Sequence, residues 1–340
     1  MIVQMKKGAQ AKDIKYLQDF LIEKGFGIKD ASSDTLCLFG ILGDVKSLDM
    51  DQIKVFPGVE TVTRISSPYK LASKAFKQDP TIITLKNGVQ IGGDEFVVMS
   101  GPCSVESREQ LEIIAKAVKE SGSRILRGGV FKPRTSPYAF QGLGIEGLKM
   151  MREVADELGM AIVTELMGTE HIDAFVEYAD IIQIGARNMQ NFDLLKAVGK
   201  TKTPILLKRG LSNTIEEWLM SAEYIMASGN EQVILCERGI RTFEKYTRNT
   251  LDISAVLAVR ELSHLPVIVD PSHAAGKWEM IEDLSLASLA VRADGIIVEV
   301  HHEPEKALSD GAQSLKPKKF EQMMERLEKL STVLDKKVRR

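Results

Sequence analysis

From residue 96 onward, short apolar runs alternate with longer amphipathic stretches, and this alternation restricts the possible folds more than any other feature. Helical patterns, for example over 107–120, 216–227 and 279–291, separate the apolar runs. Strands that alternate with helices of 10–15 residues are typical of a parallel sheet. Eight such units in about 245 residues match the size of a (β/α)8 barrel. The expected strands are 96–100, 125–128, 161–165, 180–185, 204–208, 233–237, 266–270 and 295–300.

A doubly wound open sheet would show the same alternation. Such a sheet usually carries a glycine-rich nucleotide-binding turn after its first strand, whereas here Gly101-Pro102-Cys103 follows the first strand. The sequence therefore favours the closed barrel. Ahead of it, residues 85–91 predict a β-hairpin with Asn87-Gly88 at the turn. A hairpin at that point of the chain could close the bottom of the barrel.

Residues 1–66 predict a separate small unit. The order of its patterns is β-α-β-β-α-β, which is the ferredoxin-like arrangement. Residues 67–80 read as a polar connector, and residues 81–340 as the barrel with its hairpin. Cys37 lies inside an apolar run and is expected in the core. The expected elements are strand 2–5, helix 11–24, strands 26–31 and 35–41, helix 48–54 and strand 59–65.

Composition excludes several classes of protein. The formal net charge of −2 at pH 7 gives no electrostatic reason to expect nucleic-acid or membrane binding. The chain has no apolar run of the roughly 18 residues that a membrane span needs, and no signal-peptide pattern. Three widely separated cysteines do not make a disulfide framework. We therefore expect a reduced, cytoplasmic protein.

Potential metal ligands follow several of the expected strands. In a (β/α)8 barrel, chemistry occurs at the C-terminal ends of the strands. A thiol, an imidazole and two carboxylates there suit Mn²⁺, Fe²⁺, Co²⁺ or Zn²⁺ rather than Ca²⁺ or Mg²⁺. Taken singly, a cysteine, histidine or aspartate at such a place can be structural, but a carboxylate inside an apolar run needs a partner. The four residues are Cys103, His273, Glu299 (the one in the apolar run) and Asp310.

Positively charged residues gather at the same strand ends. So many cations at one barrel mouth would repel one another unless anions bind there. Arginine pairs with phosphate and carboxylate groups through two hydrogen bonds, so the expected ligands are organic phosphates. The residues are Arg127, Lys132, Arg134, Arg187, Lys208 and Arg238.

The remaining histidines and cysteine are expected to be structural or are left open. Cys236 lies in the middle of a strand and is expected in the core. His171 and His264 have a structural interpretation. His301 and His302 could either flank the metal or face solvent.

The motifs at these strand ends closely resemble those of the 3-deoxy-D-arabino-heptulosonate 7-phosphate (DAHP) synthases of the Iβ type. The resemblance covers residues 81–335, and residues 1–66 resemble the ferredoxin-like (ACT-like) regulatory domain of some of these enzymes. Two departures, His302 in place of proline and Ala274-Ala275 in place of Gly-Thr, touch no matched functional residue. The motifs are Ser100-Gly-Pro-Cys-Ser-Val-Glu106, Leu126-Arg-Gly-Gly, Lys132-Pro-Arg-Thr-Ser136, Gln183-Ile-Gly-Ala-Arg-Asn188, Leu207-Lys-Arg-Gly210, Cys236-Glu-Arg-Gly239, Asp270-Pro-Ser-His273 and Val298-Glu-Val300.

The resemblance implies an activity and a set of roles. This family condenses phosphoenolpyruvate with erythrose 4-phosphate and releases phosphate, in the first step of the shikimate pathway. One divalent metal ion (Mn, Fe, Co or Zn) would be held by Cys103, His273, Glu299 and Asp310. Phosphoenolpyruvate would be held by Arg127, Lys132, Arg187, Lys208 and Arg238, and the phosphate end of erythrose 4-phosphate by Arg134 and Thr135. Lys132 is the candidate proton donor, with metal-bound water as the alternative, and Cys103 and His273 join it as catalytic residues through the metal.

Two other functions remain open at this point. One is 3-deoxy-manno-octulosonate 8-phosphate synthase, which uses arabinose 5-phosphate and carries an Ala-Asn-Arg version of the 132–136 loop. The other is a barrel that binds an effector without catalysis, against which the intact set of ligands and cations argues. The resemblance also implies a homotetramer, and inhibition by tyrosine or phenylalanine through an N-terminal domain that covers the barrel mouth. Deletion of residues 1–66 is then expected to leave an active but insensitive enzyme.

Overall fold

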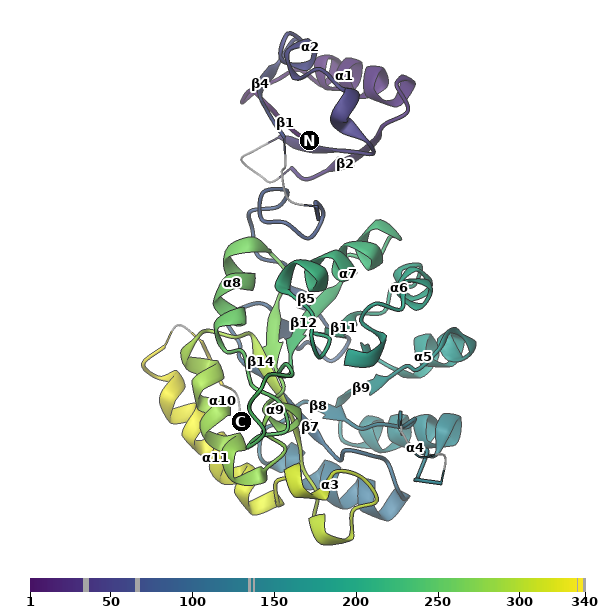
Figure 1. The fold of residues 1–340 in the computed structure, drawn as a ribbon, viewed down its shortest axis with the longest axis vertical. Coiled ribbons are helices and arrows are strands. Elements are labelled where there is room, and N and C mark those ends of the chain that lie inside the picture. The colour runs from purple at the N-terminus through teal and green to yellow at the C-terminus, as the bar shows by residue number, and fades with distance from the viewer. Residues whose placement is uncertain (33–36, 65–67, 134–135, 137, 335, 339–340) are drawn as a thin grey trace. The chain divides into compact units, whose positions relative to one another are not determined.

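The structure is a computed structural model that describes residues 1–32, 37–64, 68–133, 136, 138–334 and 336–338. The chain divides into two compact units, Met1–Asp79 and Pro80–Arg340, which are described separately (Figure 1).

Eight parallel strands of the larger unit form a closed barrel, as the sequence predicted. The strands are hydrogen-bonded in the order β10-β11-β12-β13-β14-β7-β8-β9. The last strand closes on the first through a parallel register in which Glu299 lies opposite Gly101. An open doubly wound sheet is thereby excluded. The strands are β7 Val97–Gly101, β8 Ile125–Arg127, β9 Ala161–Glu165, β10 Ile181–Ile184, β11 Ile205–Lys208, β12 Val233–Glu237, β13 Val267–Val269 and β14 Gly295–Glu299.

Helices surround the barrel on its outside (Figure 1). Several begin at residues that suit helix starts: the Ser107 side chain caps α3, and Thr214 and Glu217 form a capping box at α7. Within the described part of the chain, every helix is too short or too polar to cross a membrane. The helices are α3 Arg108–Glu120, α4 Gly144–Glu157, α5 Ile172–Tyr178, α6 Phe192–Gly199, α7 Ile215–Ala227, α8 Ser254–Leu262, α9 Pro271–Ala275, α10 Ile281–Ala290 and α11 Pro317–Ser331. Short 3-10 turns lie at η2 Thr169–His171, η3 Ala186–Asn188, η4 Trp278–Met280, η5 Pro304–Lys306 and η6 Gly311–Gln313.

The predicted hairpin closes the N-terminal end of the barrel. Strands β5 (Ile83–Thr84) and β6 (Gln90–Ile91) pair antiparallel, and Gly88 at the turn has φ +80°, a value that favours glycine. Apolar side chains of the hairpin share one buried cluster with inward-facing residues of the barrel strands. The cluster includes Ile83, Leu85, Val89 and Ile91 of the hairpin and Val97, Ile125, Ala161, Ile181 and Cys236 of the barrel, so Cys236 is a core residue, as predicted.

The smaller unit has the ferredoxin-like order. Its antiparallel sheet runs β2-β3-β1-β4, and α1 and α2 lie on one face of the sheet (Figure 1). The core between helices and sheet contains Leu17, Leu21, Phe39 and Ile41, and Cys37 packs against it. The elements are β1 Ile2–Met5, α1 Ala11–Glu23, β2 Gly27–Asp30, β3 Leu38–Leu42, η1 Val45–Ser47, α2 Met50–Lys54 and β4 Val59–Thr63.

The segment 68–79 packs more closely than a polar connector would. Tyr69, Leu71 and Phe76 are buried. A Cβ atom placed on Gly40 would collide with the Phe76 ring. Side chains alternate between the faces of a strand, and Phe39 and Ile41 point toward the helices. Phe76 therefore covers the opposite face of the sheet.

Candidate active site

A polar cavity of about 280 Å³ opens at the C-terminal ends of the barrel strands. Six of the residues predicted from the sequence line it, and each comes from the end of a strand or from the loop that follows. They are Lys132, Arg187, Lys208, Arg238, His273 and Asp310. Arg134 and Thr135, the other predicted loop residues, lie outside the described residues.

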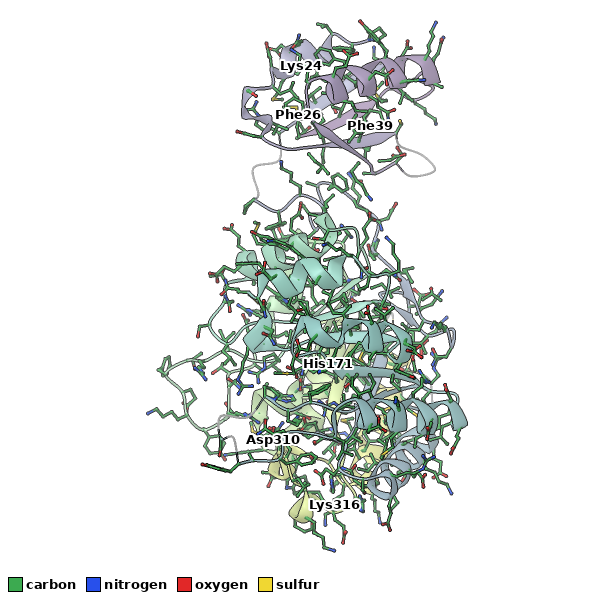
Figure 2. All side chains as sticks on the ribbon, turned by 90° about the vertical axis from the view of Figure 1, so that its right-hand side faces the viewer. Lys24, Phe26, Phe39, His171, Asp310 and Lys316 are labelled. Carbon is green, nitrogen blue, oxygen red and sulfur yellow. The ribbon has the colours of Figure 1, made fainter. Side chains whose placement is uncertain are left out.

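The four predicted metal ligands lie next to one another. Ligand atoms of Cys103, Glu299 and Asp310 all lie within 4.8 Å of one another. The Cys103 Sγ is 3.6 Å from Asp310 Oδ2, and the His273 Nε2 is 3.5 Å from Glu299 Oε1. A buried thiol, an imidazole and two carboxylates form a donor set that fits a borderline divalent ion. Figure 2 shows Asp310 in the barrel unit.

Glu299 is buried in its apolar strand with the partners that such a carboxylate needs. Arg127 donates to its Oε1 at 3.0 Å, and Gln313 donates to its Oε2 at 2.9 Å. Burial by itself raises the pKa of Glu299, but His273, Arg127 and Lys132 outweigh burial and lower it. The carboxylate is therefore ionised and available as a ligand at neutral pH.

The Cys103 thiol lies in an environment that weakens its acidity. Burial raises its pKa to about 11, and the nearby Glu299 adds to the rise. Lys132 Nζ lies 3.1 Å from the Cys103 Sγ and 3.1 Å from the Cys103 carbonyl oxygen. Burial opposes a charge on Lys132, but Cys103 and Glu299 more than offset it and raise the pKa of the lysine. A charged ammonium group therefore stands directly beside the donor set.

Asp270 is a functional residue that the sequence reasoning treated only as the end of a strand. It is fully buried, and its Oδ2 lies 2.6 Å from Lys208 Nζ and 2.7 Å from His273 Nδ1. Burial opposes its ionisation, yet His273 and Lys208 hold its pKa well below the usual range. The hydrogen bond at Nδ1 leaves the His273 Nε2 facing Glu299. The Asp-Pro-Ser-His pattern contains a signal for this role, because Asp270 also caps α9 by accepting from the His273 N–H.

The predicted cations differ in their partners, and Arg127 is buried beneath the cavity residues rather than among those that line it. Arg127 pairs with Glu299 and Lys208 with Asp270. Arg238 is buried and donates to the Gly239 carbonyl oxygen at 3.3 Å, and burial lowers its pKa. Arg187 is exposed at the rim.

Two further arginines, which the sequence reasoning missed, line the cavity from the loop after β12. They are Arg241 and Arg248. Arg248 NH1 lies 3.2 Å from Asp310 Oδ2 and donates to Gln313 Oε1 at 2.7 Å. Only their place after a barrel strand could have indicated this position, because neither arginine belongs to the motifs at the strand ends.

The remaining histidines stand apart from the donor set. His264 is bonded to Thr81 at 2.7 Å, and His171 stacks on Phe131 with ring centroids 4.8 Å apart, so both are structural, as predicted. His301 is buried, stacks on His302, and directs its Nε2 toward Glu106 Oε2 at 3.8 Å. Burial excludes the solvent-facing alternative for His301, and its place beside the metal stays a prediction.

The geometry agrees with comparisons to known proteins. Residues 80–336 match the model of the DAHP synthetase I family, and residues 1–67 match that of the DAHP synthase ferredoxin-like domain. A phospho-2-dehydro-3-deoxyheptonate aldolase of Thermotoga maritima is 51% identical over 338 residues, covering 99% of this chain and 100% of the relative. A 2-dehydro-3-deoxyphosphooctonate aldolase of Geobacter sulfurreducens is 32% identical over 269 residues, covering 72% of this chain and 96% of the relative.

Solved structures give the same result. The crystal structure of the Thermotoga maritima DAHP synthase superposes with a TM-score of 0.79 at 50% identity and covers 99% of this chain and 98% of that chain. A truncated form of the DAHP synthase from the same organism has a TM-score of 0.74 at 53% identity and covers 79% of this chain and 98% of that chain. By its motifs, its barrel and these matches, the chain belongs to the DAHP synthetase I family.

Proposed function

We propose a division of roles among the cavity residues for the reaction that this chain catalyses. That reaction condenses phosphoenolpyruvate with erythrose 4-phosphate and water to give DAHP and phosphate, the first step of the shikimate pathway. The observation that carries the assignment is the meeting of a thiol–imidazole–dicarboxylate donor set with a ring of cations in one cavity.

Cys103, His273, Glu299 and Asp310 are the proposed ligands of one Mn²⁺, Fe²⁺, Co²⁺ or Zn²⁺ ion. The DAHP synthase family is metal-dependent, and the donor set fits such an ion. When bound, the ion supplies Lewis acidity toward the aldehyde oxygen of erythrose 4-phosphate. Asp270 orients His273 through its Nδ1, as carboxylates commonly orient histidine ligands.

The cations bind and orient the two substrates. Arg127, Lys132, Arg187, Lys208 and Arg238 are proposed to hold the phosphate and carboxylate of phosphoenolpyruvate, and Arg134 and Thr135 the phosphate of the sugar. Guanidinium groups bind such anions through paired hydrogen bonds. Fixing both anions places C3 of the enol phosphate against C1 of the aldehyde, which removes much of the entropic cost of the bond-forming step.

Lys132 is the proposed proton donor. Its raised pKa keeps the ammonium charged at neutral pH, and its place beside Cys103 puts it next to the aldehyde oxygen of a substrate at the donor set. The new bond joins C3 of phosphoenolpyruvate to C1 of the sugar while Lys132 protonates the aldehyde oxygen. Water then adds to C2, and phosphate leaves as its C–O bond breaks.

The deciding experiment measures the disappearance of phosphoenolpyruvate with erythrose 4-phosphate or arabinose 5-phosphate, each with and without a chelator. Consumption with the four-carbon sugar alone, lost on chelation and restored by Mn²⁺, is the expected result. Preference for arabinose 5-phosphate would reassign the substrate to that of the octulosonate relatives. Consumption of neither would favour the effector-binding barrel.

The ligand assignment has its own test. We expect Cys103→Ser to lose metal-dependent turnover and most of its metal affinity, because a hydroxyl does not ionise as a thiol does. A Cys103→Ser protein with full activity and full metal content would contradict the assignment.

The N-terminal unit is proposed to bind tyrosine or phenylalanine as an inhibitor. Its match to the DAHP synthase ferredoxin-like domain supports this role, since ferredoxin-like regulatory domains bind small effectors. A protein lacking residues 1–66 is expected to remain active and to be insensitive to both amino acids. Continued inhibition of the shortened protein would contradict the proposal.

We also propose that the chain assembles as a homotetramer. The proposal rests on the resemblance to the Iβ enzymes. Light scattering coupled to size-exclusion chromatography gives the mass directly, and a monomer or dimer at micromolar concentration would contradict it.

A further inference from the structure

The loop that carries Asp310 is tied by its backbone to a distant carboxylate. Glu106 Oε1 accepts a hydrogen bond from the Leu308 N–H at 2.8 Å, across 202 residues of sequence. Burial raises the pKa of Glu106, and the backbone N–H groups of Leu308 and Ser309 oppose that rise. Hydrogen bonds to an ionised acceptor are about twice as strong as neutral ones. Glu106 therefore fixes the two residues that immediately precede Asp310.

Glu106 is itself anchored to the connector that carries Cys103. It lies three residues after Cys103, and its N–H donates to Gln110 Oε1 at 3.3 Å. Gln110 is buried and donates to the Ser104 carbonyl oxygen at 3.0 Å. The Val105 N–H in turn donates to the Gly129 carbonyl oxygen. The Glu106 carboxylate therefore lies on a segment whose backbone is hydrogen-bonded to Gln110 on one side and to Gly129 on the other.

The two loops also meet at the donor set. Cys103 Sγ lies 3.4 Å from the Ser309 Oγ and 3.6 Å from Asp310 Oδ2. The far side of the Glu106 carboxylate faces His301 Nε2 at 3.8 Å. That nitrogen has no hydrogen-bond partner in the described part of the chain, and both side chains are largely buried.

We propose that Glu106 is a positioning residue, which clamps the Asp310 loop to the Cys103 connector and thereby sets the separation of two ligands of the metal site. The proposal rests on the metal site assigned above. It gives the glutamate of the Ser100–Glu106 motif a role distinct from substrate binding, because its Oε1 accepts from a backbone N–H of the loop. A metal site whose ligands come from separate loops depends on such outer contacts for the ligand geometry.

The test compares three variants of the full-length protein. Glu106→Ala removes both acceptor atoms, Glu106→Gln keeps one acceptor oxygen, and Glu109→Ala removes an exposed carboxylate three residues further on as a matched control. Two quantities are measured: Mn²⁺ affinity by competition with a fluorescent chelator, and hydrogen exchange of the backbone amides of residues 304–312 without metal.

We expect Glu106→Ala to bind Mn²⁺ about 10–100-fold more weakly, the usual effect of losing an outer-shell partner, and to exchange the Leu308 and Ser309 amides faster. Glu106→Gln should lose only a few-fold in affinity, and Glu109→Ala should match the parent. Unchanged affinity and unchanged loop exchange in Glu106→Ala would overturn the proposal.

Two other results, a variant that does not fold and a parent protein that binds no Mn²⁺, also have a defined interpretation. If Glu106→Ala fails to fold, Glu106→Asp replaces it: the shorter side chain cannot reach both N–H groups, and the same two changes are expected at smaller size. Parent-like affinity and exchange in Glu106→Asp would then overturn the proposal. If the parent protein itself bound no Mn²⁺, the metal assignment would fail, whereas the amide exchange would still decide whether Glu106 holds the loop.

Discussion

The two ends of the barrel are built from the same eight strands and differ in the balance of apolar and charged contacts. Toward the N-terminal end, the hairpin and residues of the barrel strands form one apolar cluster, beside a buried ion pair of Lys336 with Asp294. At the C-terminal end, ion pairs are buried: Arg127 with Glu299, Lys208 with Asp270, and Arg209 with Glu237. The ion pairs that border the cavity thus lie at the C-terminal end, whereas the apolar cluster lies toward the N-terminal end.

Apolar burial and buried ion pairs contribute differently to the free energy of unfolding. Full burial of a large aliphatic side chain contributes about 1.5–3 kcal/mol, and the N-terminal cluster contains many of them. A buried ion pair contributes little net stability, because desolvation offsets the attraction, but the loss of one partner costs about 3–5 kcal/mol. The charges at the C-terminal end are therefore best explained by the anions and the metal they bind.

The largest effect is expected when the charged end loses a carboxylate that two groups share. Asp270→Ala leaves Lys208 without its counter-ion and His273 without its orienting partner. We expect a loss of about 3–5 kcal/mol in unfolding free energy, and a fall of about 10–100-fold in kcat/KM because a metal ligand is no longer oriented. Urea unfolding and steady-state kinetics measure the two losses.

Asp270→Asn is the companion variant. It keeps an acceptor for His273 while removing the charge, so it should lose less stability than Asp270→Ala and still be impaired in catalysis. If both variants kept parent-like kcat/KM, Asp270 would be a structural residue of the strand end and nothing more.

At the apolar end, the expected loss is in stability alone. Ile91 is fully buried in the hairpin cluster, so Ile91→Ala should lower the unfolding free energy by about 2–5 kcal/mol and leave kcat unchanged below the melting temperature. Ile82, 53% exposed on the same hairpin, is the control: Ile82→Ala should change stability by less than about 0.5 kcal/mol. A fall in kcat for folded Ile91→Ala would show that the two ends are coupled.

The apolar end was also the more predictable of the two. Strand and helix periodicity predicted the barrel, and Asn87-Gly88 predicted the hairpin. Both signals depend only on residues that are close together in the sequence. At the charged end, the sequence predicted six of the residues that line the cavity from their place at strand ends, because parallel strands bring their ends together whatever the exact register.

What the sequence did not predict depends on contacts between distant segments. Asp270 was overlooked because its importance lies in the two groups that it contacts, one of them 62 residues away. Arg248 belongs to no motif, and its role follows only from its distance to Asp310. The sequence placed Phe76 in a polar connector, because its packing against Gly40 exists only in the folded sheet.

A smaller effect is expected from pH, through the thiol of the charged end. Burial raises the pKa of Cys103 to about 11, whereas burial lowers that of His273, so at neutral pH the thiol is protonated and the imidazole is neutral. Metal binding must then release one proton, from Cys103. Mn²⁺ affinity should rise about tenfold for each pH unit between about pH 7 and 9, as one released proton requires. Competition titrations at several pH values measure the slope, and a flat profile would mean that the thiolate is not a ligand.

The smallest effect is expected at the rim of the cavity, where Arg248 contacts Asp310 in a partly exposed pair. Such pairs contribute about 0.2–1 kcal/mol, so Arg248→Ala should change affinities only a few-fold, but in opposite directions. Mn²⁺ should bind more tightly because a competing cation leaves Asp310, and KM for the anionic substrates should rise because the mouth loses a positive charge. Arg241→Ala, which removes a cation from the same cavity, should raise KM and leave Mn²⁺ affinity unchanged. Weaker Mn²⁺ binding in Arg248→Ala would instead show that this arginine orients Asp310 for the metal.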